Sequence, residues 1–321
     1  MAKNYTVAEE DGDWEEAFAA TLGAEVPGDL AGLRLDQALA RMFPQYSRNR
    51  LQAWLKSGNV RLDGGAAEAS LEVLGGEKVE VDPPPAADVA APRAQKMDLK
   101  VVHQDADLIV IDKPAGLIVH PGAGNPEGTL MNGLLAHAPA LRQVPRAGIV
   151  HRLDKDTSGL LVVAANLSAQ ANLAAQLAAR TVKRRYLALV QGDPPSQGTI
   201  EAAIGRDPRL RTRMAVSSRG KEARTRYRVI ERFGHAALVE CFLDTGRTHQ
   251  IRVHFQHIRH PIVGDPVYRR GTRNLIPFPR QALHAAALEL EHPASGKHMA
   301  WSSPLPADMK KLLAKLQRDG N

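Results

Sequence analysis

A run rich in proline and alanine, residues 83–97, divides this chain of 321 residues into two parts. Pro83-Pro84-Pro85 favours an extended polyproline conformation, and the residues that follow as far as Pro92 offer little surface to bury. We therefore expect a linker here. The chain is long enough for a folded domain on each side. The sequence predicts a small N-terminal domain over residues 30–82 and a larger domain over residues 98–321.

Charge is distributed unevenly along the chain. The first 27 residues contain one lysine and seven acidic residues, and the whole chain has a net charge of +7, so the remainder carries +13. We expect the acidic residues 1–29 to form a disordered tail. A body this basic fits a polyanionic partner, first of all nucleic acid, although a basic surface that serves only solubility would give the same charge.

The smaller domain has the pattern of two helices followed by strands. Apolar residues repeat at helical intervals over 35–43 and 51–55, and Ser47 is placed to cap the second helix. Short strands are predicted over 60–64 and 77–81. Bases that flank the two helices could grip RNA phosphates, or the helices could be an ordinary amphipathic pair: they are Arg34, Arg41, Arg48, Arg50, Lys56 and Arg61.

Strands predominate in the larger domain. They are predicted at 101–102, 108–111, 160–164, 186–190, 227–230 and 237–243, with helices over 130–137, 168–179 and 309–316. These elements do not alternate with the regular period of βαβ units. We therefore predict an α+β domain built on a mixed, mainly antiparallel sheet.

Nothing in the sequence predicts a membrane or secreted protein. No run of about 18 apolar residues occurs, and the N-terminus has no apolar segment of the signal-peptide type. The single cysteine, Cys241, excludes an internal disulfide and is expected to be a small buried hydrophobic residue. We expect a cytoplasmic protein and, because the chain lacks heptads, a monomer.

A dense polar run, residues 151–158, leads directly into the apolar run 159–164. Polar groups at the entrance to a buried strand must form hydrogen bonds or do chemistry, because unpaired burial costs roughly 1–3 kcal/mol per group. Asp154 and Asp156 could act as a pair in acid–base work or metal binding. The surrounding bases, Arg152 and Lys155, argue against a metal and favour one carboxylate kept ionised by arginine. A simple turn-forming aspartate remains the alternative.

Three further segments combine bases with turn or strand residues. Lys113 leaves a predicted strand for a glycine-rich loop, for which we favour a structural role. Tyr186 follows three bases on a predicted strand, where it could stack on a nucleobase or fill the core. Residues 243–255 place bases and histidines after a Thr-Gly turn; the histidine spacing matches no known zinc pattern, so we expect no metal.

Together these segments resemble the pseudouridine synthases of the RluA family. The resemblance runs from Arg34 to Pro306 and rests on His-Arg-Leu-Asp ending at Asp154, on Arg-Tyr-x-Ala at Tyr186 and on Thr-Gly-Arg-x-His-Gln-Ile-Arg ending at Arg252. Residues 34–64 resemble the S4 RNA-binding domain, with Asp63-Gly64 at a turn where that family usually has Asn-Gly. The resemblance implies the fold of that family and isomerisation of uridine in RNA, without metal or other cofactor.

The resemblance also implies a role for individual residues. Asp154 matches the catalytic aspartate, Tyr186 the tyrosine that stacks on the target uracil, and Arg152 an arginine that helps displace the nucleotide. Arg247 matches the base that pairs with the carboxylate, with Arg252 of the same motif as the alternative. The S4 resemblance assigns RNA binding to four bases: Arg34, Arg48, Arg50 and Lys56.

The resemblance also implies a substrate, a set of uridines in a stem-loop of large-subunit (23S) rRNA, free or in a pre-ribosomal particle. Three routes are open to the Asp154 carboxylate: attack on the ribose, addition to the uracil ring, or abstraction of a sugar proton. A non-catalytic RNA-binding or ribosome-assembly factor would use the same basic surface. A glycoside hydrolase would need a second acid, for which Asp156 is the nearby candidate, but the basic composition disfavours a neutral sugar.

Overall fold

The computed structural model describes residues 22–43, 46, 48–82, 92–122, 125–210, 213–269 and 276–319. The chain divides into two compact units at the boundary between Pro92 and Arg93. Within the described ranges, no helix combines the length and the apolar character needed to cross a lipid bilayer.

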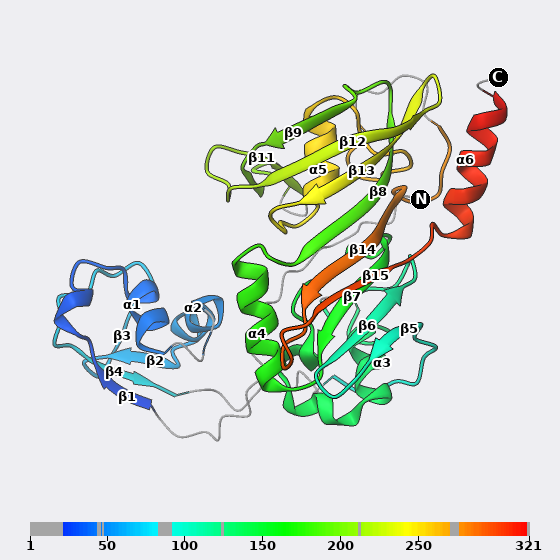
Figure 1. Cartoon of the computed structure of the whole chain (residues 1–321). Coiled ribbons are helices and arrows are strands. Elements are labelled where there is room, and N and C mark those ends of the chain that lie inside the picture. Colours follow the sequence, from blue (N-terminus) through cyan, green and yellow to red (C-terminus); the bar gives the residue numbers. More distant parts are fainter. Residues whose placement is uncertain are drawn as a thin grey trace. The chain divides into compact units, whose positions relative to one another are not determined.

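The N-terminal unit is a four-stranded antiparallel sheet with the strand order β1-β4-β2-β3, accompanied by two helices (Figure 1). Leu35, Leu39, Leu51 and Trp54 pack together in its core, so the two predicted helices form through their apolar faces. The predicted N-cap, Ser47, lies outside the described residues. The elements are β1 (Leu22–Glu25), the 3-10 helix η1 (Gly28–Leu30), α1 (Leu35–Met42), α2 (Arg48–Lys56), β2 (Val60–Leu62), β3 (Gly65–Ala66) and β4 (Lys78–Val81).

The predicted tail and the predicted linker both end too late in the sequence. The tail was expected to reach residue 29, but β1 pairs with β4, from Leu22 opposite Val81 to Glu25 opposite Lys78, so residues 22–29 belong to the folded unit. The linker was expected to reach residue 97. Instead, the Gln95 amide donates to the Asn132 carbonyl at 2.9 Å, and Asn132 Nδ2 donates to the Arg93 carbonyl at 2.8 Å. Residues 1–21 and 83–91 lie outside the described part of the chain.

The larger unit contains a nine-stranded sheet with the path β5-β6-β7-β14-β8-β13-β12-β9, and β15 pairs with β14 off this path. All its pairs are antiparallel except β7 with β14, which confirms the predicted mixed, mainly antiparallel α+β fold. The nine strands of this sheet are β5 (Val101–Gln104), β6 (Leu108–Lys113), β7 (Ser158–Ala164), β8 (Lys183–Gln191), β9 (Gln197–Glu201), β12 (Arg224–Arg232), β13 (Ala236–Leu243), β14 (Leu283–Glu291) and β15 (His298–Ser302). Two further strands, β10 (Ile204–Arg206) and β11 (Met214–Val216), pair with each other in a separate antiparallel sheet. The helices are α3 (Leu130–His137), η2 (Pro139–Gln143), η3 (Pro145–Gly148), α4 (Leu167–Ala178), α5 (Gln250–His257) and α6 (Ala307–Asp319).

The central strands are apolar on both faces because both faces are covered. Alternate residues of β7 enter different cores: Leu161 packs in the cluster that includes Leu134 of α3, whereas Leu160 packs in the cluster that includes Leu173 of α4. This alternation is the two-residue period of a strand. It explains why residues 159–164 form an unbroken apolar run.

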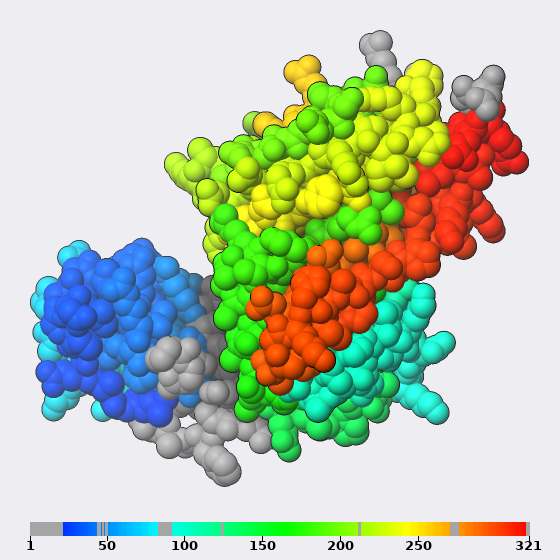
Figure 2. All heavy atoms as spheres, viewed as in Figure 1, coloured from blue at the N-terminus to red at the C-terminus, as the bar shows by residue number. Residues whose placement is uncertain are grey.

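The C-terminal helix α6 is part of the larger unit. Met309 and Leu312 are buried in the main core cluster, and α6 (red) lies against the sheet in Figure 2. Arg280, on the segment before β14, forms a bidentate ion pair with Asp308 in the first turn of α6. The same guanidinium donates to the Asp156 carbonyl at 3.0 Å, so the helix is tied to the polar loop that precedes β7.

Candidate active site

The polar segments singled out by sequence meet at the centre of the large sheet. Across it, Gly159 of β7 is opposite Ala285 of β14, Ala285 is opposite Tyr186 of β8, and Tyr186 is opposite Cys241 of β13. The loop before β7 carries Asp154, and the loop after β13 leads into α5. Three segments far apart in sequence are therefore brought to one place by strand order and register.

A glycine at the start of β7 permits this close arrangement. Gly159 has φ +110°, and a Cβ built there would lie 2.2 Å from the Ala285 carbonyl oxygen. No side chain fits in that space, so β7 and β14 can approach each other only with glycine at this position.

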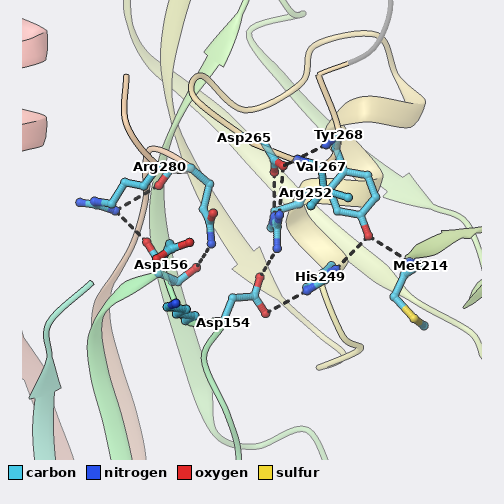
Figure 3. A network of polar contacts seen from close by, with 12 residues as sticks. Asp154, Asp156, Met214, His249, Arg252, Asp265, Val267, Tyr268 and Arg280 are labelled. Carbon is cyan, nitrogen blue, oxygen red and sulfur yellow. Dashed lines mark hydrogen bonds and ion pairs between the residues drawn. The ribbon is translucent and has the colours of Figure 1, made fainter. Parts of the chain in front are cut away.

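Asp154 is a largely buried carboxylate with one oxygen engaged. Its side chain is 16% exposed, and Oδ2 accepts a hydrogen bond from Arg252 Nη1 at 2.9 Å. Oδ1 lies 3.8 Å from His249 Nε2, beyond hydrogen-bonding distance, and accepts no hydrogen bond from the described residues (Figure 3). Burial opposes ionisation, but the charge and hydrogen bond of Arg252 and the charge of Arg152 act against it, and the pKa of Asp154 lies below its ordinary value. The site thus presents an ionised carboxylate with a free oxygen.

Arg252 is itself held from behind. Its Nε and Nη2 donate to the two oxygens of Asp265 at 2.7 and 3.0 Å, and its guanidinium lies 5.0 Å from the centroid of the Tyr268 ring. Asp265 also accepts the backbone N–H groups of Val267 and Tyr268. Burial works against the charge of Arg252, yet the carboxylates of Asp265 and Asp154 raise its pKa. A guanidinium fixed in this way presents Nη1 to Asp154 in one direction.

The prediction that Arg247 pairs with Asp154 is wrong, and the alternative residue of the same motif makes the contact. Arg247 lies in the loop before α5, where its Nε donates to the Glu222 carbonyl at 3.0 Å. Arg252 is in the first turn of α5, and the helix turns its side chain toward the loop before β7. Arg247 still lines the same pocket.

The pocket has a volume of about 430 Å³, enough for a nucleoside-sized group. All five residues predicted for the larger domain line it: Arg152, Asp154, Tyr186, Arg247 and Arg252. Tyr186 is 6% exposed. Burial, together with the charge of Asp154, raises its pKa, so its hydroxyl stays neutral. Arg152 is exposed, which leaves its guanidinium accessible to a polyanion.

Lys113 fixes the loop that carries Asp154. This agrees with the structural role that the sequence favours for this lysine. Its Nζ donates to the carbonyls of Pro114, Leu117 and Lys155 at 2.8–2.9 Å. Burial lowers the pKa of Lys113 to about 7, although Asp154 and Asp156 oppose the change. Three carbonyl acceptors explain how an amine can be buried here.

The second predicted site lies in the N-terminal unit. Asp36 is completely buried there and accepts hydrogen bonds from Arg34, Arg48 and Gln52. The side chains of Arg34 and Arg48 remain 49% and 45% exposed, so one acid fixes two arginines that also face solvent. Lys56 is exposed. The side chain of Arg50 lies outside the described part of the structure.

Among the described residues, one group is close enough to hold a metal ion: Asp105, Asp107 and His292. His292 Nδ1 accepts the backbone N–H groups of Ala294 and Ser295, so its hydrogen is on Nε2, which donates to Asp105 at 3.2 Å. Burial would raise the pKa of Asp105, but hydrogen bonds, first from His103, lower it to about 2. Because hydrogen bonds already use these groups, they carry no metal assignment.

Sequence reasoning missed Asp265 and Tyr268. Asp265 follows a glycine in an ordinary Gly-Asp-Pro turn, and nothing in that pattern shows that it faces an arginine thirteen residues earlier. His249 enters the sequence prediction only as one of the histidines of residues 243–255, whose spacing matches no known zinc pattern. Its neighbour Tyr268 is completely buried.

Comparison with known proteins assigns this arrangement to a class. The model of the RNA pseudouridylate synthase family matches residues 107–257, and that of the S4 domain matches residues 33–79. The chain belongs to the RNA pseudouridylate synthase family.

Two curated relatives are the ribosomal large subunit pseudouridine synthases D of Nitrosomonas europaea and Pseudomonas aeruginosa. The first is 55% identical over 299 residues, which cover 91% of this chain and 87% of the relative. The second is 50% identical over 309 residues, 92% and 96% of the two chains. The solved structure of human RNA pseudouridylate synthase domain containing 4 is 28% identical with a TM-score of 0.55, covering 68% of this chain and 92% of the human one.

Proposed function

We propose that this chain converts specific uridines to pseudouridine in large-subunit rRNA, with Asp154 as its catalytic carboxylate. The observation that carries the proposal is the buried Asp154 carboxylate, with Oδ2 held by Arg252 and Oδ1 open to the pocket. Relatives that align over nine-tenths of the chain are named for the large ribosomal subunit. The expected target is a stem-loop of 23S rRNA, free or in a pre-ribosomal particle.

The reaction breaks the N-glycosidic bond, turns the uracil and rejoins it to the ribose through carbon. A duplex hides that bond, so the nucleotide must leave its stack and enter the pocket. Tyr186 is placed as the surface for the uracil ring, and the exposed Arg152 as the group that takes the space of the displaced nucleotide. All three routes for Asp154 need an ionised carboxylate. Arg252 supplies that condition without covering Oδ1.

The N-terminal unit supplies RNA affinity in this proposal. Arg34 and Arg48, oriented by Asp36, together with Lys56, are directed to backbone phosphates. Arg50 shares this role by its place in the S4 motif. We expect the chain to act as a monomer in the cytoplasm and to need no cofactor.

The decisive experiment compares wild type with Asp154→Asn. Pseudouridines are mapped in rRNA from cells that lack the gene and carry either version. The wild-type chain should restore specific sites, and the variant should restore none, with a rate at least about 10⁴-fold lower on purified RNA. RNA affinity and the unfolding temperature should stay close to wild type. A variant that still makes pseudouridine would remove Asp154 from catalysis. A wild-type chain that makes none would overturn the function.

A further inference from the structure

We propose that His249 donates a hydrogen bond from Nε2 to the substrate nucleotide next to Asp154, and that Tyr268 fixes the ring tautomer that makes this possible. The inference rests on the proposed function, since it assigns a role within the same pocket. His249 lines that pocket together with Asp154 and Tyr186.

The backbone at His249 is unusual. The residue precedes α5 with φ +56° and ψ +20°, in the left-handed region that few residues other than glycine adopt. Such strain persists only where the surroundings impose it, and it gathers at functional sites. Here the ring is directed toward Asp154, with Nε2 3.8 Å from Oδ1 and a side chain 12% exposed (Figure 3).

The hydrogen-bond partners of Tyr268 determine where the histidine carries its hydrogen. The Tyr268 hydroxyl oxygen accepts the backbone N–H of Met214 at 3.1 Å and lies 2.9 Å from His249 Nδ1. If Nδ1 carried the hydrogen, the hydroxyl hydrogen of this fully buried tyrosine would lack an acceptor among the described residues. The arrangement that satisfies every group has Tyr268 donating to Nδ1. A neutral His249 then carries its hydrogen on Nε2.

The charged groups around the ring favour that neutral form. Burial is the largest influence and, with the charges of Arg252 and Arg152, lowers the pKa of His249; the carboxylates of Asp154 and Asp265 oppose it. A ring protonated on both nitrogens would also lose Nδ1 as an acceptor for Tyr268. The geometry and the charges therefore agree on an N–H at Nε2.

The distance between Nε2 and Oδ1 leaves both groups available. A hydrogen bond needs about 3.2 Å or less, so at 3.8 Å neither group satisfies the other. An oxygen of the uridine that approaches Oδ1, a ribose hydroxyl or a uracil carbonyl, comes within reach of the same N–H. His249 thus contacts substrate, whereas Tyr268 is a positioning residue that acts through it.

The first test compares His249→Leu with His249→Gln, because the glutamine amide can place an N–H close to the position of Nε2. In single-turnover reactions at saturating rRNA, His249→Leu should be about 10- to 100-fold slower than wild type. RNA affinity should change less than about two-fold, and His249→Gln should recover most of the rate. If wild type is active and His249→Leu reacts at the same rate, the inference is overturned and the proposed function stands. A wild type that forms no pseudouridine overturns the proposed function as well.

The second test reads the tautomer directly and needs no activity. Ring nitrogen-15 shifts of labelled protein distinguish hydrogen on Nε2 from hydrogen on Nδ1, and the His249 signal is assigned by its loss in His249→Gln. Wild type should show Nε2–H, and Tyr268→Phe should give a mixture of tautomers and a several-fold slower reaction. Hydrogen on Nδ1 in wild type overturns the inference. Melting curves verify that each variant is folded. If His249→Leu does not fold, His249→Gln and Tyr268→Phe still test the inference through the tautomer measurement.

Discussion

Each of the two units contains a buried aspartate that faces arginine, and the two sites differ in what their oxygens do. In the N-terminal unit, Asp36 is 0% exposed; Oδ1 accepts Arg34, and Oδ2 accepts Arg48 and Gln52. In the larger unit, Asp154 is 16% exposed, and only Oδ2 accepts a hydrogen bond from the described residues. Both acids have a pKa below the ordinary value.

Burial and a low pKa therefore do not distinguish a reactive carboxylate from a structural one. Asp154 differs because Arg252 contacts it through Nη1 alone, while Nε and Nη2 donate to Asp265. Arg252 therefore keeps Asp154 ionised through one carboxylate oxygen only. At Asp36 the direction of support is reversed: one acid holds two arginines, whose exposed parts are available to a partner. The site at Asp154 therefore presents a carboxylate oxygen, and the site at Asp36 presents guanidinium groups.

The largest effect after loss of Asp154 itself is expected from Arg252→Lys. Lysine keeps the charge but cannot form the bidentate pair with Asp265 while contacting Asp154. We expect a single-turnover rate about 10²- to 10³-fold lower and an unfolding free energy about 1–3 kcal/mol lower. Single-turnover kinetics and denaturant unfolding measure the two.

The matched control is Arg247→Lys, from the same motif and pocket. Arg247 contacts the Glu222 carbonyl and not Asp154, so its variant should weaken RNA binding and leave the rate at saturation within about three-fold. Equal losses of rate in both variants would contradict the assignment of the carboxylate partner to Arg252.

A smaller and different effect is expected from Asp36→Asn. Removing the charge releases Arg34 and Arg48 from a shared acceptor, which should lower stability by about 1–3 kcal/mol and weaken RNA binding several-fold. The rate at saturating RNA should not change. Glu80→Gln is the control, because its pair with Arg61 is about half exposed on both sides and should matter by less than about 1 kcal/mol. A slower reaction at saturation in Asp36→Asn would show that the two sites are not separate in function.

The sequence predicted the parts of the molecule that depend on local pattern. The strand predicted at 160–164 lies within β7 (Ser158–Ala164), and the helix predicted over 130–137 is α3, because apolar periodicity and turn residues act within a few positions. The resemblance chose Asp154 over Asp156, and the structure leaves Asp156 at the carbonyl contact with Arg280.

What failed depended on contacts between distant segments. Arg247 and Arg252 have the same charge five residues apart, and the choice between them depends on the direction of α5 and on Asp265 in a later turn. Likewise, residues 22–25 sit in an acidic stretch, and only pairing with β4 makes them a strand. Neither fact is expressed in the local pattern.

The smallest expected effect is an absence of pH dependence between about pH 5 and pH 7. Because arginine lowers the folded-state pKa of Asp36 and of Asp154, the stability that each contributes is complete above the unfolded value of about 3.9 and is lost as the pH falls through the folded value. The stability difference between wild type and Asp36→Asn should therefore be constant from pH 7 to pH 5 and shrink only below about pH 4. Over the same range, the single-turnover rate should show no acid limb from Asp154. If the rate falls near pH 6 in wild type and in His249→Gln alike, the effect of burial on the Asp154 pKa exceeds that of Arg252. Asp154 would then not share the lowered pKa of Asp36, and the comparison of the two aspartates would be wrong.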